Sequence, residues 1–195
     1  MGSANCIGLM GGSFNPVHNG HISIASSFLE SDVIDELWIL LTPKSPHKDG
    51  EKLAGYVHRL EMLKIVFCSW DNVIVSDFER NLPTPSYTIQ TISELKKKYP
   101  KKSFYLCLGE DSLANFSSWH KWKEILEKVS LLVASRPDFK PTDKTLLKKA
   151  FFVNHDEIAV SSTEVRKKIA NGVDVQGLIP DSVLKYIKKH NLYTS

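Results

Sequence analysis

The sequence predicts an α/β fold, a Rossmann-like doubly wound parallel sheet with helices on both faces, in a single domain over residues 1–195. Short apolar runs of strand type alternate with segments of helical spacing, which is typical of a parallel sheet covered on both sides. The length, with 42% hydrophobic and 24% charged residues, is that of one ordinary globular domain. Ligands of such sheets bind beyond the carboxyl ends of the strands, so functional motifs are expected there.

The elements follow from hydrophobic periodicity. Five strands are expected, at residues 7–10, 37–41, 73–75, 104–108 and 129–133. Six helices are expected, at residues 20–31, 57–68, 87–99, 119–127, 162–171 and 181–190. Residues 43–55 and 136–143 contain Pro and exceed the usual length of a connection, so we expect functional loops there.

Composition argues against several classes of protein. The formal net charge of +3 is too small to indicate a nucleic-acid or membrane partner, and the lysine-rich residues 96–102 are typical of a solvated helix end. No apolar run of about eighteen residues is present. Three cysteines without CxxC spacing indicate free thiols in a reducing compartment. We therefore expect a cytoplasmic protein.

The first motif is the run GGSFNPVHNGH at residues 11–21, between the first strand and the first helix. Glycines let the backbone approach a ligand closely, and the N–H groups at a helix start favour an anion. His18 and His21 are three residues apart, which places both rings on one face of the first helical turn. The run thus indicates a site for the phosphates of a nucleotide. Neither a GxGxxG fingerprint nor a GxxxxGK[ST] loop is present.

A second motif, SSTEVR, occupies residues 161–166. Ser162 can act as an N-cap, so hydroxyl and N–H groups gather at a helix start while Arg166 adds a permanent charge one turn later. Alone, the motif is equally well explained as a helix cap followed by a surface arginine.

A third group follows the fourth expected strand. An acidic residue such as Asp111 at a strand end can accept a hydrogen bond from a ribose hydroxyl or help to hold a cation. The indole of Trp119 can stack on a flat ring. The alternative is that Asp111 caps a short helix and that both tryptophans are core residues, which we favour for Trp122.

These motifs resemble a known family. The first matches the GxFxPxHxGH signature of the nucleotidyltransferase superfamily, except that Asn15 replaces the commoner Asp, which puts a role for negative charge there in question. The second resembles the SSTxxR motif that accompanies it. The ordered set, which also includes residues 45–48, 59–62, 86–91, 135–137 and 177–180, resembles bacterial-type nicotinate mononucleotide adenylyltransferases over nearly the whole chain.

The resemblance implies transfer of AMP from ATP to nicotinate mononucleotide, which yields nicotinate adenine dinucleotide and pyrophosphate in NAD biosynthesis. It implies catalytic roles for His18, His21, Lys48 and Arg166. It implies an ATP site at Gly11, Gly12, Ser13, Phe14, Asn15, Gly109, Asp111, Ser161, Ser162 and Thr163. Thr88 and Trp119 would bind the mononucleotide, through the backbone and by stacking respectively. Mg²⁺ is expected on the β- and γ-phosphates, held mostly by ATP and water rather than by protein ligands.

Other functions stay open at this point. The acceptor can also be nicotinamide mononucleotide or phosphopantetheine, although Trp119 and the chain length argue against the latter. A nucleic-acid-binding relative of class I aminoacyl-tRNA synthetases is disfavoured by the absence of a KMSKS-like loop and of a strong basic surface. A nucleotide sensor would be favoured if either histidine or Arg166 were missing. We expect ATP and nicotinate mononucleotide as partners, no nucleic acid and no membrane, and leave a homo-oligomer open.

Overall fold

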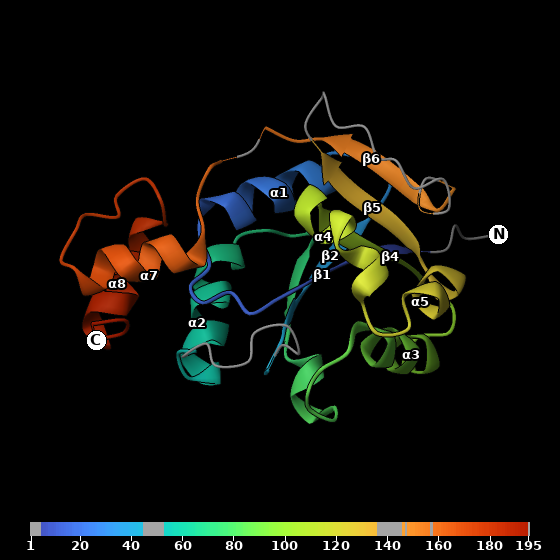
Figure 1. The fold of residues 1–195 in the computed structure, drawn as a ribbon, viewed down its shortest axis with the longest axis horizontal. Helices are drawn as coiled ribbons and strands as arrows, with labels where there is room; N and C mark the ends of the chain where they lie inside the picture. Colours follow the sequence, from blue (N-terminus) through green and yellow to red (C-terminus); the bar gives the residue numbers. More distant parts are fainter. Residues whose placement is uncertain (1–4, 45–52, 136–145, 147, 157, 195) are drawn as a thin grey trace.

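A six-stranded parallel sheet organises the chain (Figure 1). The computed structural model describes residues 5–44, 53–135, 146, 148–156 and 158–194. The strands are β1 (Cys6–Gly12), β2 (Glu36–Leu41), β3 (Val73–Ser76), β4 (Ser103–Gly109), β5 (Ser130–Ser135) and β6 (Ala150–Asn154). Their order is β3-β2-β1-β4-β5-β6, and every neighbouring pair is parallel. This is the order of a doubly wound fold, whose direction of winding reverses between β1 and β4.

The five expected strands are confirmed, and β6 is a sixth that the sequence pattern does not predict. It pairs with β5 from Leu131↔Ala150 to Ser135↔Asn154. It has a single neighbour in the sheet, and Phe151 and Phe152 remain 49% and 38% exposed. An edge strand buries little of its surface, so a short apolar run suffices to form it, and that run is a weak signal.

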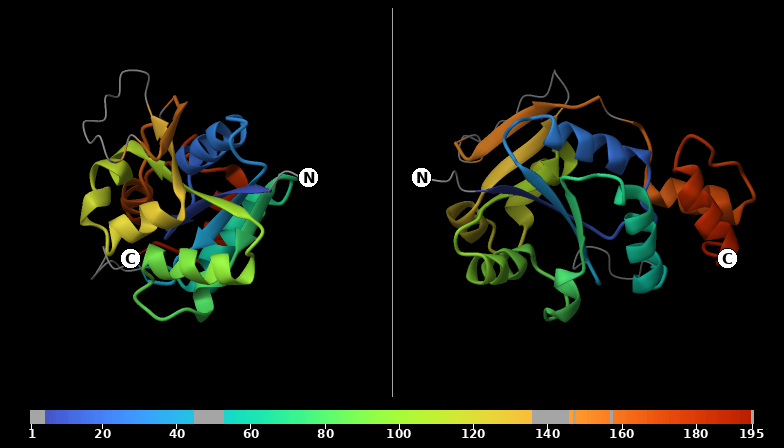
Figure 2. Two further views of the ribbon diagram at one scale, coloured as in Figure 1. Left: turned by 90° about the vertical axis from the view of Figure 1, so that its right-hand side faces the viewer. Right: turned by 180° about the vertical axis from the view of Figure 1, so that it is seen from behind.

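Helices cover both faces of the sheet (Figures 1 and 2). One face carries α1 (Asn19–Leu29) and α2 (Tyr56–Phe67), and the other carries α3 (Thr88–Lys98), α4 (Glu110–Ala114) and α5 (Trp122–Lys128). Two 3₁₀ turns, η1 (Phe78–Asn81) and η2 (Phe116–Ser118), lie in the connections. The helix expected at residues 119–127 begins only at Trp122, because the backbone of Trp119 is extended, with φ −71° and ψ 143°.

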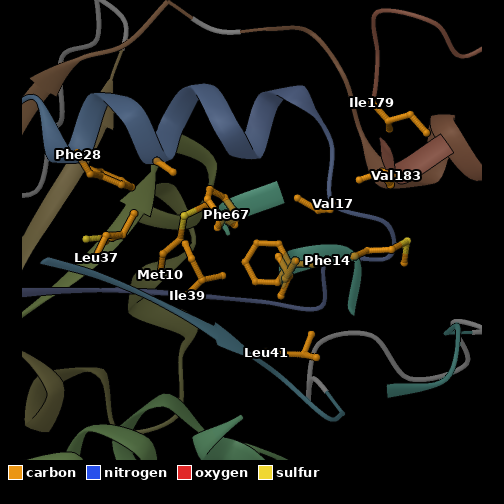
Figure 3. Close-up of a cluster of buried hydrophobic side chains, with 14 of the residues drawn as sticks. Met10, Phe14, Val17, Phe28, Leu37, Ile39, Leu41, Phe67, Ile179 and Val183 are labelled. Carbon is orange, nitrogen blue, oxygen red and sulfur yellow. The ribbon is translucent and has the colours of Figure 1, made fainter. Parts of the chain in front are cut away.

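Alternate side chains of each strand enter two separate clusters, as the period of two along a strand requires. Met10 and Ile39 face α1 and α2, whereas Leu9 and Leu40 face α3 and α5. Figure 3 shows the first cluster, in which Phe28 of α1 lies beside Met10 and Leu37 of the sheet.

The C-terminal helices, α7 (Ser162–Ala170) and α8 (Asp181–Lys189), lie side by side beyond α1 and α2 (Figures 1 and 2). Ile179 and Val183 extend the first cluster past Val17 (Figure 3). The two helices therefore share a core with the sheet.

The structure also bears on three expectations from composition, which concern the lysine-rich helix end, the cysteines and membrane-spanning helices. Lys96, Lys97 and Lys98 are exposed in the last turn of α3, which confirms a solvated helix end. All three cysteines are free thiols, and Cys107 is buried. None of the helices in the described ranges is long and apolar enough to cross a membrane.

Candidate active site

A cleft of about 340 Å³ opens where the winding of the sheet reverses. The chain leaves β1 towards α1 on one face and leaves β4 towards α4 on the other, so the two loops diverge and leave a hollow between them. The structure brings six predicted residues together around it, and they come from both loops: Gly11, His18, His21, Gly109, Asp111 and Trp119.

The two histidines stack at the start of α1. His18 is the N-cap, in extended backbone, and the helix begins one residue later. The ring centroids are 3.6 Å apart at an interplanar angle of 29°. The backbone N–H of His18 donates to Nδ1 of His21 at 3.2 Å. Because Nδ1 of His21 accepts, its neutral ring carries the proton on Nε2 and can donate from there.

Burial controls the charge of His18, which is 7% exposed. Loss of solvation disfavours the imidazolium and lowers the pKa of His18 to about 4. Its Nδ1 is buried and has no hydrogen-bond partner among the residues that the structure describes. His18 is therefore neutral at physiological pH in the protein without a nucleotide.

Gly20 makes room for this ring. A Cβ at position 20 would lie 3.1 Å from Nδ1 of His18 and 3.1 Å from Cγ1 of Val160. Both contacts are closer than side chains normally approach, so a larger residue would displace the His18 ring. Packing therefore favours glycine between the two histidines.

The loop after β1 supports the histidines from behind. Phe14 is 2% exposed, has a φ of +44°, and places its ring 4.9 Å from that of His21. A Cβ on Gly12 would lie 3.0 Å from the Phe14 ring. The Phe14 side chain belongs to the core and supports His21, and its contact with ATP stays a prediction for its backbone alone.

Asn15 joins three segments of the chain and is 1% exposed. Its Oδ1 accepts from the backbone N–H of Ala54 at 3.0 Å and from the Tyr193 hydroxyl at 2.9 Å. Its backbone oxygen accepts from Nη1 of Arg166 at 2.8 Å. An amide oxygen satisfies these donors without placing a charge in the interior, which explains how Asn serves where Asp is commoner.

The second motif packs against the first. Ser161, and not Ser162, is the N-cap of α7, because its Oγ accepts from the N–H of Glu164 at 3.1 Å. The hydroxyl of Ser162 instead donates to the carbonyl of Pro16 at 2.8 Å. Nη2 of Arg166 lies 3.3 Å from Oγ1 of Thr163, so the arginine links the start of α7 to Asn15.

Arg59 of α2, from the motif at residues 59–62, is a structural anchor that the sequence does not assign to the site. Its side chain is 2% exposed. It donates to four backbone oxygens at 2.7–3.2 Å, those of Ser13, Thr42, Pro43 and Ala54. It therefore fastens the loop after β1, including Ser13, to the end of β2.

The remaining predicted residues are less central. Thr88 is the first residue of α3 and does not line the cleft. Trp119 lines the cleft and also packs on Phe116, with ring centroids 5.4 Å apart. Lys48 lies outside the described residues. The structure adds His155 and Val160 to the lining of the cleft, and no motif in the sequence marks His155.

The cleft offers few ligands for a metal ion. Within the described ranges, no group of three or more His, Cys, Asp or Glu side chains is arranged to hold one. Glu110 and Asp111 are the carboxylates that line the cleft. This donor set fits an ion that takes most of its ligands from a nucleotide and water.

Known proteins resemble the chain over most of its length. The family model described as cytidylyltransferase-like matches residues 9–168. The nicotinate-nucleotide adenylyltransferase of Bacillus subtilis is 35% identical over 97% of this chain and 98% of its own. A probable nicotinate-nucleotide adenylyltransferase of Flavobacterium johnsoniae is 35% identical over 96% and 98%. The solved structure of Plasmodium falciparum nicotinic acid mononucleotide adenylyltransferase complexed with NaAD has a TM-score of 0.82 over 97% of both chains, and at 24% identity it supports the fold.

Proposed function

The chain belongs to the cytidylyltransferase-like family, and from that premise we propose that it transfers AMP from ATP to nicotinate mononucleotide. The products are nicotinate adenine dinucleotide and pyrophosphate, in a step of NAD biosynthesis. The observation that carries the proposal is the stacked pair of His18 and His21 at the reversal point of the sheet. Similarity over the full length to curated relatives of that name supports the choice of acceptor.

The reaction needs charge compensation more than a base. An oxygen of the mononucleotide phosphate attacks the α-phosphorus of ATP, and the bond from that phosphorus to the oxygen bridging to the β-phosphate breaks. Pyrophosphate leaves with the electron pair of that bond. The nucleophile is already an anion near neutral pH, so positioned donors and cations are what lower the barrier.

The two histidines and Arg166 provide that compensation. His21 donates from Nε2, because its Nδ1 is occupied by the His18 N–H. The negative charge of a bound triphosphate favours protonation of His18, whose pKa burial alone lowers to about 4. Arg166 adds a permanent charge at the start of α7, in a position fixed by the carbonyl of Asn15. Lys48 is proposed as a further phosphate ligand.

Mg²⁺ is the proposed cofactor. Bound to the β- and γ-phosphates, it would neutralise charge on the leaving pyrophosphate, with ATP and water as its main ligands. Asp111, at the cleft, is proposed to face the ribose of the adenosine.

Trp119 and the backbone near Thr88 are the proposed contacts of the mononucleotide. The indole would stack on the pyridine ring, and N–H groups near Thr88 would pair with its carboxylate. A carboxamide would leave one of these donors facing an NH₂ group, which costs about 1–3 kcal/mol for a buried polar group. We therefore propose the acid rather than the amide as substrate.

The test is pyrophosphate release by the purified protein. With ATP, Mg²⁺ and nicotinate mononucleotide we expect turnover, with none when Mg²⁺ is omitted. With nicotinamide mononucleotide we expect kcat/KM to be lower by about tenfold to a hundredfold. No pyrophosphate with either mononucleotide would overturn the enzyme assignment, whereas equal efficiency would overturn the acid preference alone.

The cellular setting is part of the proposal. Three free thiols favour a reducing compartment, and we propose the cytoplasm. Nucleic acid is not a proposed partner, because the formal net charge of +3 is small.

A further inference from the structure

His155 is a buried polar residue that lines the cleft and has no part in the reaction described above. It directly follows β6 and is 8% exposed. Its backbone N–H donates to the carbonyl of Ser135 at 3.0 Å. Its Nδ1 lies 3.0 Å from Oγ of Ser27, which belongs to α1. His155 therefore connects β5, through its backbone, with α1, through its ring.

The hydrogen bonds of Ser27 determine where this ring carries its proton. Oγ of Ser27 also lies 3.2 Å from the carbonyl oxygen of Ser23, which can only accept. A hydroxyl has one proton, so both contacts are hydrogen bonds only when Ser27 donates to Ser23 and His155 donates from Nδ1. In the neutral ring Nε2 is then an acceptor. The described part of the chain offers the ring of His155 no second hydrogen-bond partner.

Apolar side chains line the part of the cleft formed by α1 and β5, the two elements with which His155 forms hydrogen bonds. Ile24 and Phe28 of α1 line the cleft on one side, and Ala134 of β5 lines it from the sheet. An apolar wall beside an imidazole fits a flat heteroaromatic ring.

The course of the chain places this part of the cleft next to the residues that are proposed to bind the phosphates of ATP. Val160 lines the cleft and directly precedes Ser161, the N-cap of α7. The start of α7 carries Arg166, which is proposed to bind the phosphates of ATP. A nucleotide whose phosphates lie there can extend its base past Val160 towards His155, and both residues line the cleft. Trp119 enters the cleft from the connection that follows α4.

We propose that His155 selects the base of the nucleotide, with Nε2 accepting a hydrogen bond from the exocyclic amine of adenine. The inference rests on the proposed function and adds a specificity residue to it. A 6-carbonyl base, such as hypoxanthine or guanine, would bring an oxygen acceptor against the nitrogen acceptor and leave both unpaired. Ser27 is a positioning residue, because its hydrogen bonds keep the proton of His155 on Nδ1 and leave Nε2 as an acceptor.

The experiment compares ATP with ITP, which replaces the amine by a carbonyl, at saturating nicotinate mononucleotide. For the unaltered protein we expect kcat/KM to favour ATP by about tenfold to a hundredfold, the effect of one unpaired buried group. His155→Phe keeps a ring but removes the acceptor, so this ratio should fall at least about tenfold while KM for the mononucleotide is unchanged. The exposed His190, the C-cap of α8, gives the matched control His190→Phe, which should keep the ratio.

Two further variants separate selection from packing. His155→Gln can present either its oxygen or its NH₂ group, so it should retain activity with ATP and gain activity with ITP. Ser27→Ala removes the partner of Nδ1 and frees the tautomer, so activity with ITP should rise without a change at His155 itself. A role in packing alone predicts neither gain.

The outcomes are distinguishable from those of the proposed function. If folded His155→Phe and Ser27→Ala both keep the ratio of the unaltered protein, the inference is overturned and adenylyl transfer stands. If the unaltered protein turns over neither nucleotide, the proposed function fails. In that case calorimetric titration with ATP and ITP still tests base selection, and equal affinities would refute it.

Discussion

The burial of His18 predicts a specific dependence of stability on pH. The pKa of this imidazole falls from an ordinary 6.5 to about 4 in the folded chain. Between these values the unfolded state binds more protons than the native state, so the free energy of unfolding decreases as the pH falls. At pH 5 the unfolded ring is almost fully protonated and the native ring is not. This contributes a loss of about 2 kcal/mol relative to pH 7.5.

Urea denaturation at a series of pH values, without nucleotide, measures this contribution. His18→Asn removes the titrating ring, so the difference in unfolding free energy between the two proteins should shift by about 2 kcal/mol between pH 7.5 and pH 5. Groups that titrate in both proteins cancel in that difference. Val57→Asn, which introduces the same side chain at an exposed position without removing a titrating group, is the control and should give a constant difference. Parallel pH profiles for His18→Asn and the unaltered protein would refute the reasoning.

Three further predictions concern the site. Trp119→Ala should raise KM for the mononucleotide, as expected for a loss of about 1–3 kcal/mol in stacking, and leave KM for ATP unchanged; equal weakening of both would mean that the indole only packs on Phe116. His21→Ala should lower kcat by about a hundredfold to a thousandfold in a protein that still folds, the usual effect of removing one transition-state donor. Asn15→Asp should still fold, because its carboxylate can accept the same hydrogen bonds, and should raise KM for ATP, whereas Asn15→Leu should lose about 1–3 kcal/mol by leaving buried donors unpaired.

Local patterns were sufficient for the sheet and for the centre of the site. Apolar runs at the cores of β1, β2, β4 and β5 are long enough to identify as strands, and each motif directly follows a strand or begins a helix. The rule that ligands bind where strands end then brings Gly11 and Asp111 together across the reversal of the sheet. Strand positions and the point of reversal can be predicted in this way because they depend on short stretches of sequence and on the handedness of the connections between parallel strands.

The rest depends on contacts between distant segments. The hydrogen bond from Tyr193 to Asn15 joins residues 178 positions apart, and nothing in either local sequence indicates it. The sequence shows Arg59 only as one polar residue in a predicted helix, and the loops around it supply the four carbonyl oxygens that give it a role. His155 likewise becomes a site residue only because β6 lies beside α1.

Asn15 connects these contacts to charge in the site. Arg166 donates to the backbone oxygen of Asn15, and the side-chain oxygen of Asn15 takes up two neutral donors. The guanidinium is thus held in place by a neutral group. An Asp would accept the same hydrogen bonds, which is why Asn15→Asp should remain folded. Its carboxylate would, however, lie three positions before His18 in the chain and beside Arg166, and it would partly cancel the charge of that arginine. The backbone oxygen at position 15 therefore fixes the position of the arginine, and a neutral side chain there leaves the full charge of Arg166 for the proposed triphosphate site.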